Sequence, residues 1–161
     1  MFKIPEGIPI ECAPPILCAA ITMYDPLRHW GATTGEKMTI GIIGVGGLGT
    51  MGIKLAKALG HDVIAISTST TKETMARERG ATHFCVSTDP ESMKKHEGLC
   101  DLILNTVSVE HDLNMYLPLL DKGGVLVQMG LVLKPHSVQQ AGLMFNRKSI
   151  AGSLIGGVPA T

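Results

Sequence analysis

The chain has 161 residues, and its 14 basic and 14 acidic side chains cancel to a formal net charge of zero. This balance argues against a nucleic-acid or other polyanionic partner, and a hydrophobic fraction of 45% argues against a disordered chain. No apolar run is long enough to span a bilayer and no signal-peptide pattern is present, so we expect a cytoplasmic protein without a membrane partner. Four cysteines occur without a C-x-x-C pair, which favours free thiols over disulfides.

The first 37 residues are expected to lead into the main domain rather than to form its sheet. Prolines punctuate residues 1–15, and this composition indicates a lead-in segment outside the core. Residues 16–30 are mostly apolar and predict a helix, in which Pro26 predicts a kink or a break. A turn over residues 31–37 then connects this helix to the first expected strand.

Residues 38–67 show the pattern of strand, glycine-rich turn, helix and strand. Residues 38–43 form an apolar, β-branched run typical of a parallel strand buried on both faces. The turn matches G-x-G-x-x-G, and the following helix ends near Gly60 before a second strand at residues 62–67. In this context the motif predicts a dinucleotide whose pyrophosphate faces the free N–H groups of the helix. The residues of the motif are Gly44, Val45, Gly46, Gly47, Leu48 and Gly49.

Each glycine of the motif has a physical role in this interpretation. Gly44 allows the sharp turn off the strand, Gly46 leaves room for the pyrophosphate, and Gly49 lets the helix pack closely on the sheet. The alternative is a glycine-rich turn that only packs a helix on a sheet.

Strands and helices continue to alternate after residue 67, which indicates a parallel sheet. We therefore predict an α/β protein with a Rossmann fold over residues 38–161, a doubly wound six-stranded parallel sheet with helices on both faces. Further strands are expected at residues 83–86, 101–105, 124–129 and 148–151, and helices at 71–79, 90–96, 111–120 and 138–146.

The turn after the second strand indicates which dinucleotide is preferred. NAD-binding domains place an acidic residue near this strand end, where it binds the ribose 2′-hydroxyl. Here the chain carries hydroxyl side chains and a lysine, which leave room for a 2′-phosphate and can donate hydrogen bonds to it. We therefore expect NADP(H) rather than NAD(H), although a hydroxyl-rich helix start with a solvated lysine would look the same. The residues concerned are Ser67, Thr68, Ser69 and Lys72.

Several segments together resemble one protein family. They lie at residues 5–7, 13–24, 44–58, 66–72, 105–107, 129–130 and 151–156. In these segments the chain resembles the cofactor-binding half of zinc-dependent medium-chain alcohol dehydrogenases, most closely the cinnamyl alcohol dehydrogenase group. The resemblance implies an oxidoreductase that transfers a hydride between NADP(H) and an alcohol/aldehyde pair, with zinc as the Lewis acid.

The resemblance also implies roles for individual residues. Cys18 would be a ligand of the catalytic zinc in the parent enzyme, and Thr22 would approach the nicotinamide. The pyrophosphate would lie on the residues from Val45 to Gly49, with Leu48 supplying a backbone amide, and the 2′-phosphate would lie on the hydroxyl-rich turn. Thr106 and Val107 would line the passage between the two ends of the cofactor. The nicotinamide end would face Gly130, Leu131, Ser153, Leu154 and Ile155.

The chain departs from the family in its metal ligands. It has no Gly-His-Glu stretch and no cluster of four cysteines, and its six histidines are scattered, so we expect each histidine on the surface or in a loop. Cys18 alone cannot make a catalytic zinc site, which needs three protein ligands. We therefore expect no complete catalytic set and no zinc bound by this chain alone. The chain then corresponds to an excised domain or a truncated gene product, with residues 1–37 leading in from a missing catalytic domain.

Three functions stay open at this point. The first is a cofactor-binding domain that binds NADP(H) without turnover and meets its alcohol or aldehyde substrate through the missing domain. The second is a truncated, non-catalytic NADPH-binding module. The third is a zinc-free quinone reductase of the same superfamily, which Cys18 disfavours. In each case we expect a homodimer formed through the last sheet strands, at residues 151–158.

Overall fold

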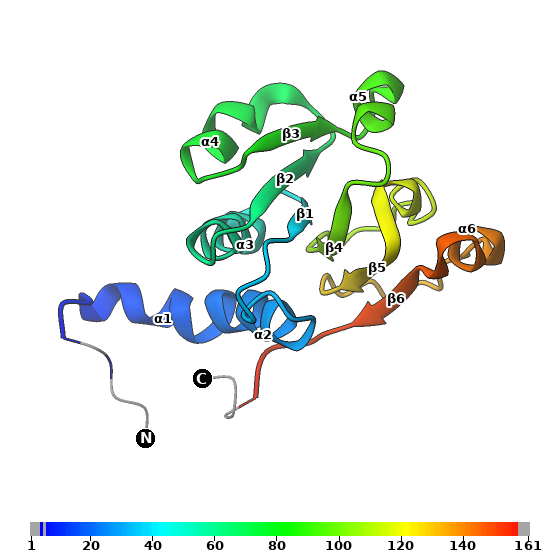
Figure 1. Ribbon diagram of the computed structural model, residues 1–161. Coiled ribbons are helices and arrows are strands. Elements are labelled where there is room, and N and C mark those ends of the chain that lie inside the picture. Colours follow the sequence, from blue (N-terminus) through cyan, green and yellow to red (C-terminus); the bar gives the residue numbers. More distant parts are fainter. Residues whose placement is uncertain (1–3, 5, 158–161) are drawn as a thin grey trace.

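A computed structural model describes residue 4 and residues 6–157 (Figure 1). Six strands, all paired in parallel, form one sheet in the order β3-β2-β1-β4-β5-β6. This is the strand order of the doubly wound dinucleotide-binding fold, so the predicted class of fold is confirmed. The strands are β1 (Thr39–Ile43), β2 (Asp62–Ser67), β3 (His83–Val86), β4 (Cys100–Asn105), β5 (Leu120–Gln128) and β6 (Ser149–Gly152).

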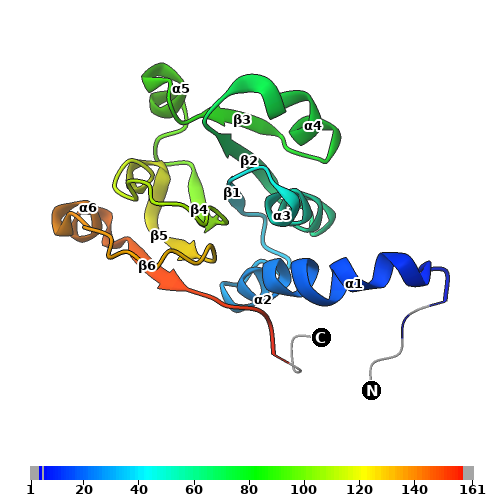
Figure 2. The same ribbon diagram turned by 180° about the vertical axis from the view of Figure 1, so that it is seen from behind.

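Helices cover both faces of the sheet, as the two opposite views show (Figures 1 and 2). One face packs against α2, α3 and α4, and the other packs against α5, α6 and the segment before β5. The two faces alternate along each strand: Val63 and Ala65 of β2 belong to the first core, while Ile64 and Ile66 belong to the second. The helices are α1 (Ala13–Pro15), α2 (Ile21–His29), α3 (Gly47–Ala58), α4 (Glu73–Glu78), α5 (Pro90–Lys95) and α6 (Gln140–Met144).

The helical region before the sheet is longer than the sequence predicts. A 3-10 turn (Ile10–Cys12), α1 and a π-helical turn (Ile16–Ala20) precede α2, and Ala13 is buried. The sequence did not predict these helical turns, but apart from Ala13 residues 10–15 are exposed and none of them belongs to either core cluster, while residues 1–3 and 5 lie outside the described part.

Pro26 neither ends nor interrupts α2, which continues to His29, so the predicted break is wrong. The buried side chains of Met23 and Leu27 fix this helix against the sheet and α3. Their burial contributes about 1.5–3 kcal/mol each, which offsets the roughly 3 kcal/mol cost of an internal proline.

Two predicted helices in the second half are wrong in extent or in kind. Residues 111–120 form no α-helix, and only Leu117–Leu119 makes a 3-10 turn. The Asp112 carboxylate accepts the Asn114 N–H at 2.9 Å, so the side chain replaces a helical hydrogen bond with a local turn. The helix expected over residues 138–146 shortens to α6, which ends where Phe145 takes an extended conformation with ψ of 123°, and Asn146 then takes a left-handed conformation with φ of 70°. Strand β5 begins at Leu120, before the predicted residue 124.

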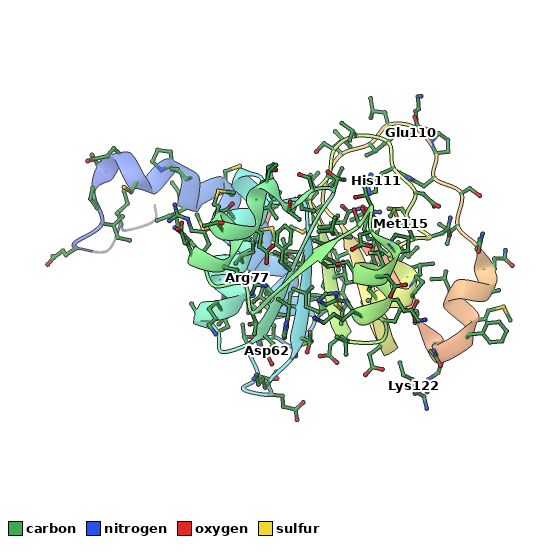
Figure 3. The ribbon with its side chains drawn as sticks, turned by 90° about the horizontal axis from the view of Figure 1, so that it is seen from above. Asp62, Arg77, Glu110, His111, Met115 and Lys122 are labelled. Atoms are coloured by element: carbon green, nitrogen blue, oxygen red, sulfur yellow. The ribbon has the colours of Figure 1, made fainter. Side chains whose placement is uncertain are left out.

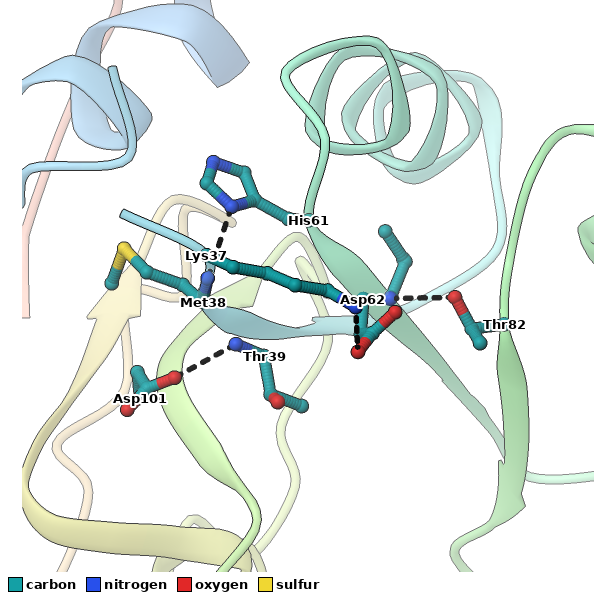
Figure 4. A network of polar contacts seen from close by, with 8 residues as sticks. Lys37, Met38, Thr39, His61, Asp62, Thr82 and Asp101 are labelled. Atoms are coloured by element: carbon teal, nitrogen blue, oxygen red, sulfur yellow. Dashed lines mark hydrogen bonds and ion pairs between the residues drawn. The ribbon is translucent and has the colours of Figure 1, made fainter. Parts of the chain in front are cut away.

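Polar contacts close the amino-terminal edge of the sheet (Figure 4). The Lys37 ammonium lies 2.8 Å from Asp62 and holds the pKa of that carboxyl below its usual value. The Asp101 carboxylate accepts the Thr39 N–H at 2.7 Å. The ring of His61 accepts the Met38 N–H at 3.2 Å through Nδ1 and donates to the carbonyl of Ala32 at 2.7 Å through Nε2. This edge is therefore structural.

Two histidines are buried, although both lie in connecting segments, His61 just before β2 and His96 just after α5, as the predicted surface or loop positions allow. His61 is 2% exposed and His96 is 5% exposed. Each ring is held by backbone groups, and Nδ1 of His96 lies 2.7 Å from the carbonyl of Ser92. Backbone partners of this kind satisfy a buried imidazole without a charge, and sequence spacing does not reveal them.

Among the described residues, no helix has both the length and the apolar character that a bilayer span requires. Strand β6 forms one edge of the sheet, the position that the predicted dimer needs, but it ends at Gly152. Residue 158 lies outside the described part, and the dimer stays a prediction.

The four cysteines are free and differ in exposure, so we expect two classes of thiol. Cys12 and Cys18 are exposed, whereas Cys85 and Cys100 are buried, and burial raises the pKa of the Cys100 thiol to about 12. Because the thiolate is the reactive form, a chromogenic thiol reagent should label two cysteines rapidly and the other two only after denaturation. Rapid labelling of all four thiols in the folded chain would contradict this burial.

Candidate functional site

The glycine-rich turn joins the carboxyl end of β1 to α3, as predicted. Gly44 has φ of +90°, and a Cβ there would lie 2.7 Å from Thr106 Oγ1. A Cβ on Gly49 would overlap the Gly44 carbonyl oxygen. Both positions therefore require glycine for the fold itself. Gly46 and Gly47 differ, because a Cβ on either would meet no atom within 4 Å, and both are exposed.

The start of α3 presents unpaired backbone donors beside this open space. The first helical hydrogen bond runs from the Thr50 N–H to the carbonyl of Gly46 at 2.8 Å, and no side chain caps the helix. The earlier N–H groups, including that of Leu48, have no partner within the helix, and they carry the positive end of its dipole. Val45 is 3% exposed and packs into the core, so it can serve a ligand only through its backbone. Helix N–H groups around an open glycine fit a pyrophosphate.

The end of β4 holds the turn from the opposite side. The Thr106 hydroxyl donates to the carbonyl of Ile43 at 2.8 Å, and its N–H donates to the same carbonyl at 3.0 Å. Thr106 and Val107 thus lie against Gly44. Their predicted place in the passage along the cofactor stays a prediction.

The turn after β2 presents hydroxyls and no acid. Thr68, Ser69 and Lys72 are exposed, and Ser67 is half-buried at the end of the strand. The Ser69 hydroxyl lies 2.8 Å from that of Thr71, and no ion pair engages Lys72 within residues 4 and 6–157. This arrangement leaves the lysine and the hydroxyls available to an anion.

A groove of about 350 Å³ opens between the carboxyl ends of β5 and β6. The Ser153 N–H donates to the carbonyl of Gln128 at 3.0 Å, so the chain still follows β5 at this point. A Cβ on Gly130 would overlap the carbonyl oxygen of Val107, which brings the groove next to the passage. Leu131 and Leu154 are exposed and face the groove. The residues lining it are Gln128, Met129, Gly130, Leu131, Gly152, Ser153 and Leu154.

The segment after β6 returns to α2 and so brings the last predicted residues near Thr22. A Cβ on Gly156 would lie 2.6 Å from Ile21 Cγ1, and Ile155 is half exposed with φ of 53°. Thr22 itself is buried, and its hydroxyl donates to the carbonyl of Cys18 at 2.6 Å.

Cys18 is exposed on the π-helical turn and lacks companions for a metal. Within residues 4 and 6–157, no three His, Cys, Asp or Glu side chains gather closely enough to bind a metal ion. A catalytic zinc needs three protein ligands and an open position, so the described residues do not fit this metal.

Three polar residues at the same edge were not predicted as site residues. Asn105 is fully buried at the end of β4, and its amide contacts both His111 and Gln128. The sequence did offer one signal for two of them: Asn105 and Gln128 are polar residues at the carboxyl ends of β4 and β5, which are neighbours in the sheet.

A sequence profile described as "Zinc-binding dehydrogenase" matches residues 47–161. This match covers more than half of the chain. The chain belongs to the zinc-binding dehydrogenase family. Membership agrees with the turn, the strand order and the groove described above.

Relatives of this zinc-binding dehydrogenase chain include NADP-dependent alcohol dehydrogenase C 1 of Mycolicibacterium smegmatis, which is 45% identical over all 161 residues. A probable cinnamyl alcohol dehydrogenase of Populus deltoides is 44% identical over 162 aligned residues. The chain spans about half the length of these relatives, 46% of the first and 45% of the second.

Solved structures of the family have the same fold. A cinnamyl alcohol dehydrogenase from Sorghum bicolor superposes with a TM-score of 0.89 and 35% identity over 98% of this chain and 45% of that one. A cinnamyl alcohol dehydrogenase from Helicobacter pylori, solved in complex with NADP(H), gives a TM-score of 0.84 and 31% identity over 98% of this chain and 44% of that one.

The two kinds of glycine in the turn predict opposite effects of alanine. Gly49→Ala should lower the free energy of unfolding by about 1–3 kcal/mol, because its methyl group would displace the Gly44 carbonyl. Gly47→Ala, at a position with open space, should leave stability unchanged or raise it by up to about 1 kcal/mol. Urea unfolding of both variants checks this difference, and equal losses of stability would contradict it.

Proposed function

We propose that this chain is the NADP(H)-binding part of a cinnamyl-type, zinc-dependent alcohol dehydrogenase that interconverts alcohols and aldehydes. The observation that carries the proposal is the pairing of two features at one edge of the sheet. Open glycines lie at the start of α3, and a turn rich in hydroxyls with one lysine follows β2. The M. smegmatis relative, named as NADP-dependent, and the H. pylori structure in complex with NADP(H) support this choice of cofactor.

Three separate groups of residues would bind the three parts of the cofactor. The free N–H groups of α3 would hold the pyrophosphate. The turn after β2 would hold the 2′-phosphate through Ser67, Thr68, Ser69 and Lys72. The groove between β5 and β6 would hold the nicotinamide, with backbone groups of Gly130 and Ser153 beside it. When bound, NADPH would donate the hydride to an aldehyde and NADP+ would accept it from an alcohol, while the chain positions the nicotinamide and shields one side of it from water.

Exposed apolar side chains support a partner domain, and one of them, Leu154, lines the groove between β5 and β6. Ile16, Leu17 and Leu133 are 40%, 53% and 89% exposed, and Leu154 is 77% exposed. Large exposed apolar side chains of this kind are candidates for a contact surface. The chain covers about half of its relatives, and we propose that the remaining half supplies the other zinc ligands, the substrate pocket and the cover for these side chains.

The cofactor preference is tested with the 161-residue chain by isothermal titration calorimetry with NADPH and NADH. We expect NADPH to bind at least about tenfold more tightly, and Ser67→Asp to lower NADPH affinity by about tenfold, or about 1.4 kcal/mol, because the new carboxylate repels the 2′-phosphate. The same charge change at Thr74, which is exposed on α4, is the matched control and should leave the preference intact. Equal or tighter binding of NADH to the unmodified chain would overturn the NADP(H) assignment.

Turnover is expected to require the other half of the enzyme. The purified chain should bind NADPH yet show no measurable alcohol oxidation with added zinc, because Cys18 is its single predicted zinc ligand. The absorbance of the reduced nicotinamide measures turnover, and zinc-dependent oxidation by the pure chain would refute the prediction.

In a longer protein that contains the chain, Cys18→Ala should lower the zinc content measured by mass spectrometry. A reading frame without the missing ligands on either side would instead favour a non-catalytic NADPH-binding module.

A further inference from the structure

Asn105 is the most deeply buried polar side chain of the carboxyl edge. It ends β4, has no exposed surface, and lies in register with Gln128 of β5. Its own carbonyl accepts the N–H groups of Met129 and Gly130 at 2.9 and 3.1 Å. Asn105 therefore joins the two strand ends whose loops line the candidate cofactor passage and the groove.

The orientation of the Asn105 side-chain amide follows from its backbone neighbour. The N–H of Val107 can only donate, and it lies 3.2 Å from Oδ1 of Asn105. The side-chain oxygen must therefore face Val107, and the Nδ2 amide must face the other two partners. Nδ2 lies 2.8 Å from Nε2 of His111 and 2.8 Å from Oε1 of Gln128.

This orientation determines the protonation state of His111. Nδ1 of His111 lies 2.7 Å from the carbonyl of Val109, which can only accept, so Nδ1 carries a proton. Nε2 must then be the bare nitrogen that accepts from Asn105. Protonation of Nε2 would set an N–H group against the Asn105 amide donor, and this hydrogen bond would be lost.

We propose that neutral His111 is a positioning residue that holds the loop of residues 105–111, and that its protonation loosens this loop and weakens NADP(H) binding. The proposal rests on the proposed function, because Thr106 and Val107 of this loop line the candidate cofactor passage. Imidazoles change charge between about pH 5 and pH 8, so affinity falls as the pH decreases through this range. Figure 3 shows His111 beside Glu110, at the edge of the molecule opposite to Asp62 and Lys122.

Four other titratable groups lie near His111 among the described residues: Glu110, Asp112, Tyr116 and His136. Glu110 pairs with Lys134 at 2.7 Å, and the Asp112 carboxylate accepts hydrogen bonds from Asn114. The Tyr116 ring centre lies 6.0 Å from that of His111, and burial raises the pKa of this phenol, which stays neutral. The His136 ring centre lies 5.6 Å away. Of these groups, His136 is the other imidazole, which makes it the control.

The experiment measures the NADPH dissociation constant of the 161-residue chain between about pH 8 and about pH 5.5. The wild-type affinity should fall by about threefold to tenfold more than that of His111→Gln, which keeps a neutral acceptor for Asn105 at every pH. The 2′-phosphate of the cofactor also ionises over this pH range, but its effect on affinity is the same for wild type and His111→Gln and drops out of the comparison. His111→Leu removes the acceptor and should weaken binding by a similar factor at every pH, whereas His136→Gln should follow the wild-type profile.

A second variant, Asn105→Asp, should reverse the direction in which NADPH affinity changes with pH. In Asn105→Asp the carboxylate still accepts the Val107 N–H and now accepts from protonated His111. The buried Nε2 of Gln128, which has no partner among the described residues, can donate to this carboxylate after rotation of its amide. Binding by Asn105→Asp should therefore strengthen, relative to wild type, as the pH falls.

A measurement on the cofactor-free chain keeps the inference separate from the proposed function. The Val107 amide resonance in nuclear magnetic resonance spectra should titrate together with the His111 ring proton, and it should not titrate in His111→Gln. A Val107 amide that is insensitive to pH, or identical pH profiles of binding for wild type and His111→Gln, would overturn the inference. Absence of NADPH binding at pH of about 8 with a titrating Val107 amide would instead overturn the proposed function while the loop contact stands.

Discussion

The close approach of α3 to the end of β1 is the constraint on which the rest of the structure depends. Gly49 lies against the carbonyl of Gly44, where no side chain fits, so the helix starts directly over the strand end. One turn later, a Cβ on Gly52 would overlap the end of Met23, so α2 also packs closely on α3. The same two glycines therefore determine the position of the N-terminus of α3 and the position of α2, which carries Thr22.

The two edges of the sheet differ in how their polar groups are satisfied. At the amino-terminal edge, Lys37, His61 and Asp101 pair with neighbouring groups of the chain. At the carboxyl edge, the helix N–H groups, the lysine after β2 and the Gln128 amide have unused capacity. Buried polar groups are normally paired, so unused donors that gather at one edge indicate a ligand there. N–H groups and an ammonium can only donate, so they suit the oxygen atoms of phosphates and not a metal ion, which needs acceptor ligands.

Sequence patterns predicted the first half of the fold well because local signals agree there. The apolar runs of β1 and β2 and the glycine turn all indicate a strand–helix–strand unit, and the structure contains it. The segment at residues 111–120 also has an apolar pattern, but the side chain of Asp112 and Pro118 favour turns over an α-helix. The burial of His61 depends on backbone groups distant in sequence, which no periodicity encodes.

The candidate site shows the same limit. The glycines and the hydroxyl-rich turn could be recognised because each is a contiguous motif with a known chemistry. The contact of Asn105 with His111 and Gln128 depends on the register of β4 with β5, and on a loop that was predicted to be a helix. The predicted helix over residues 111–120 would have begun at His111. It gave no reason to expect the His111 ring at the end of β4. The irregular segment that replaces this helix is therefore what allows the imidazole ring of His111 to contact the end of β4, beside the proposed cofactor passage.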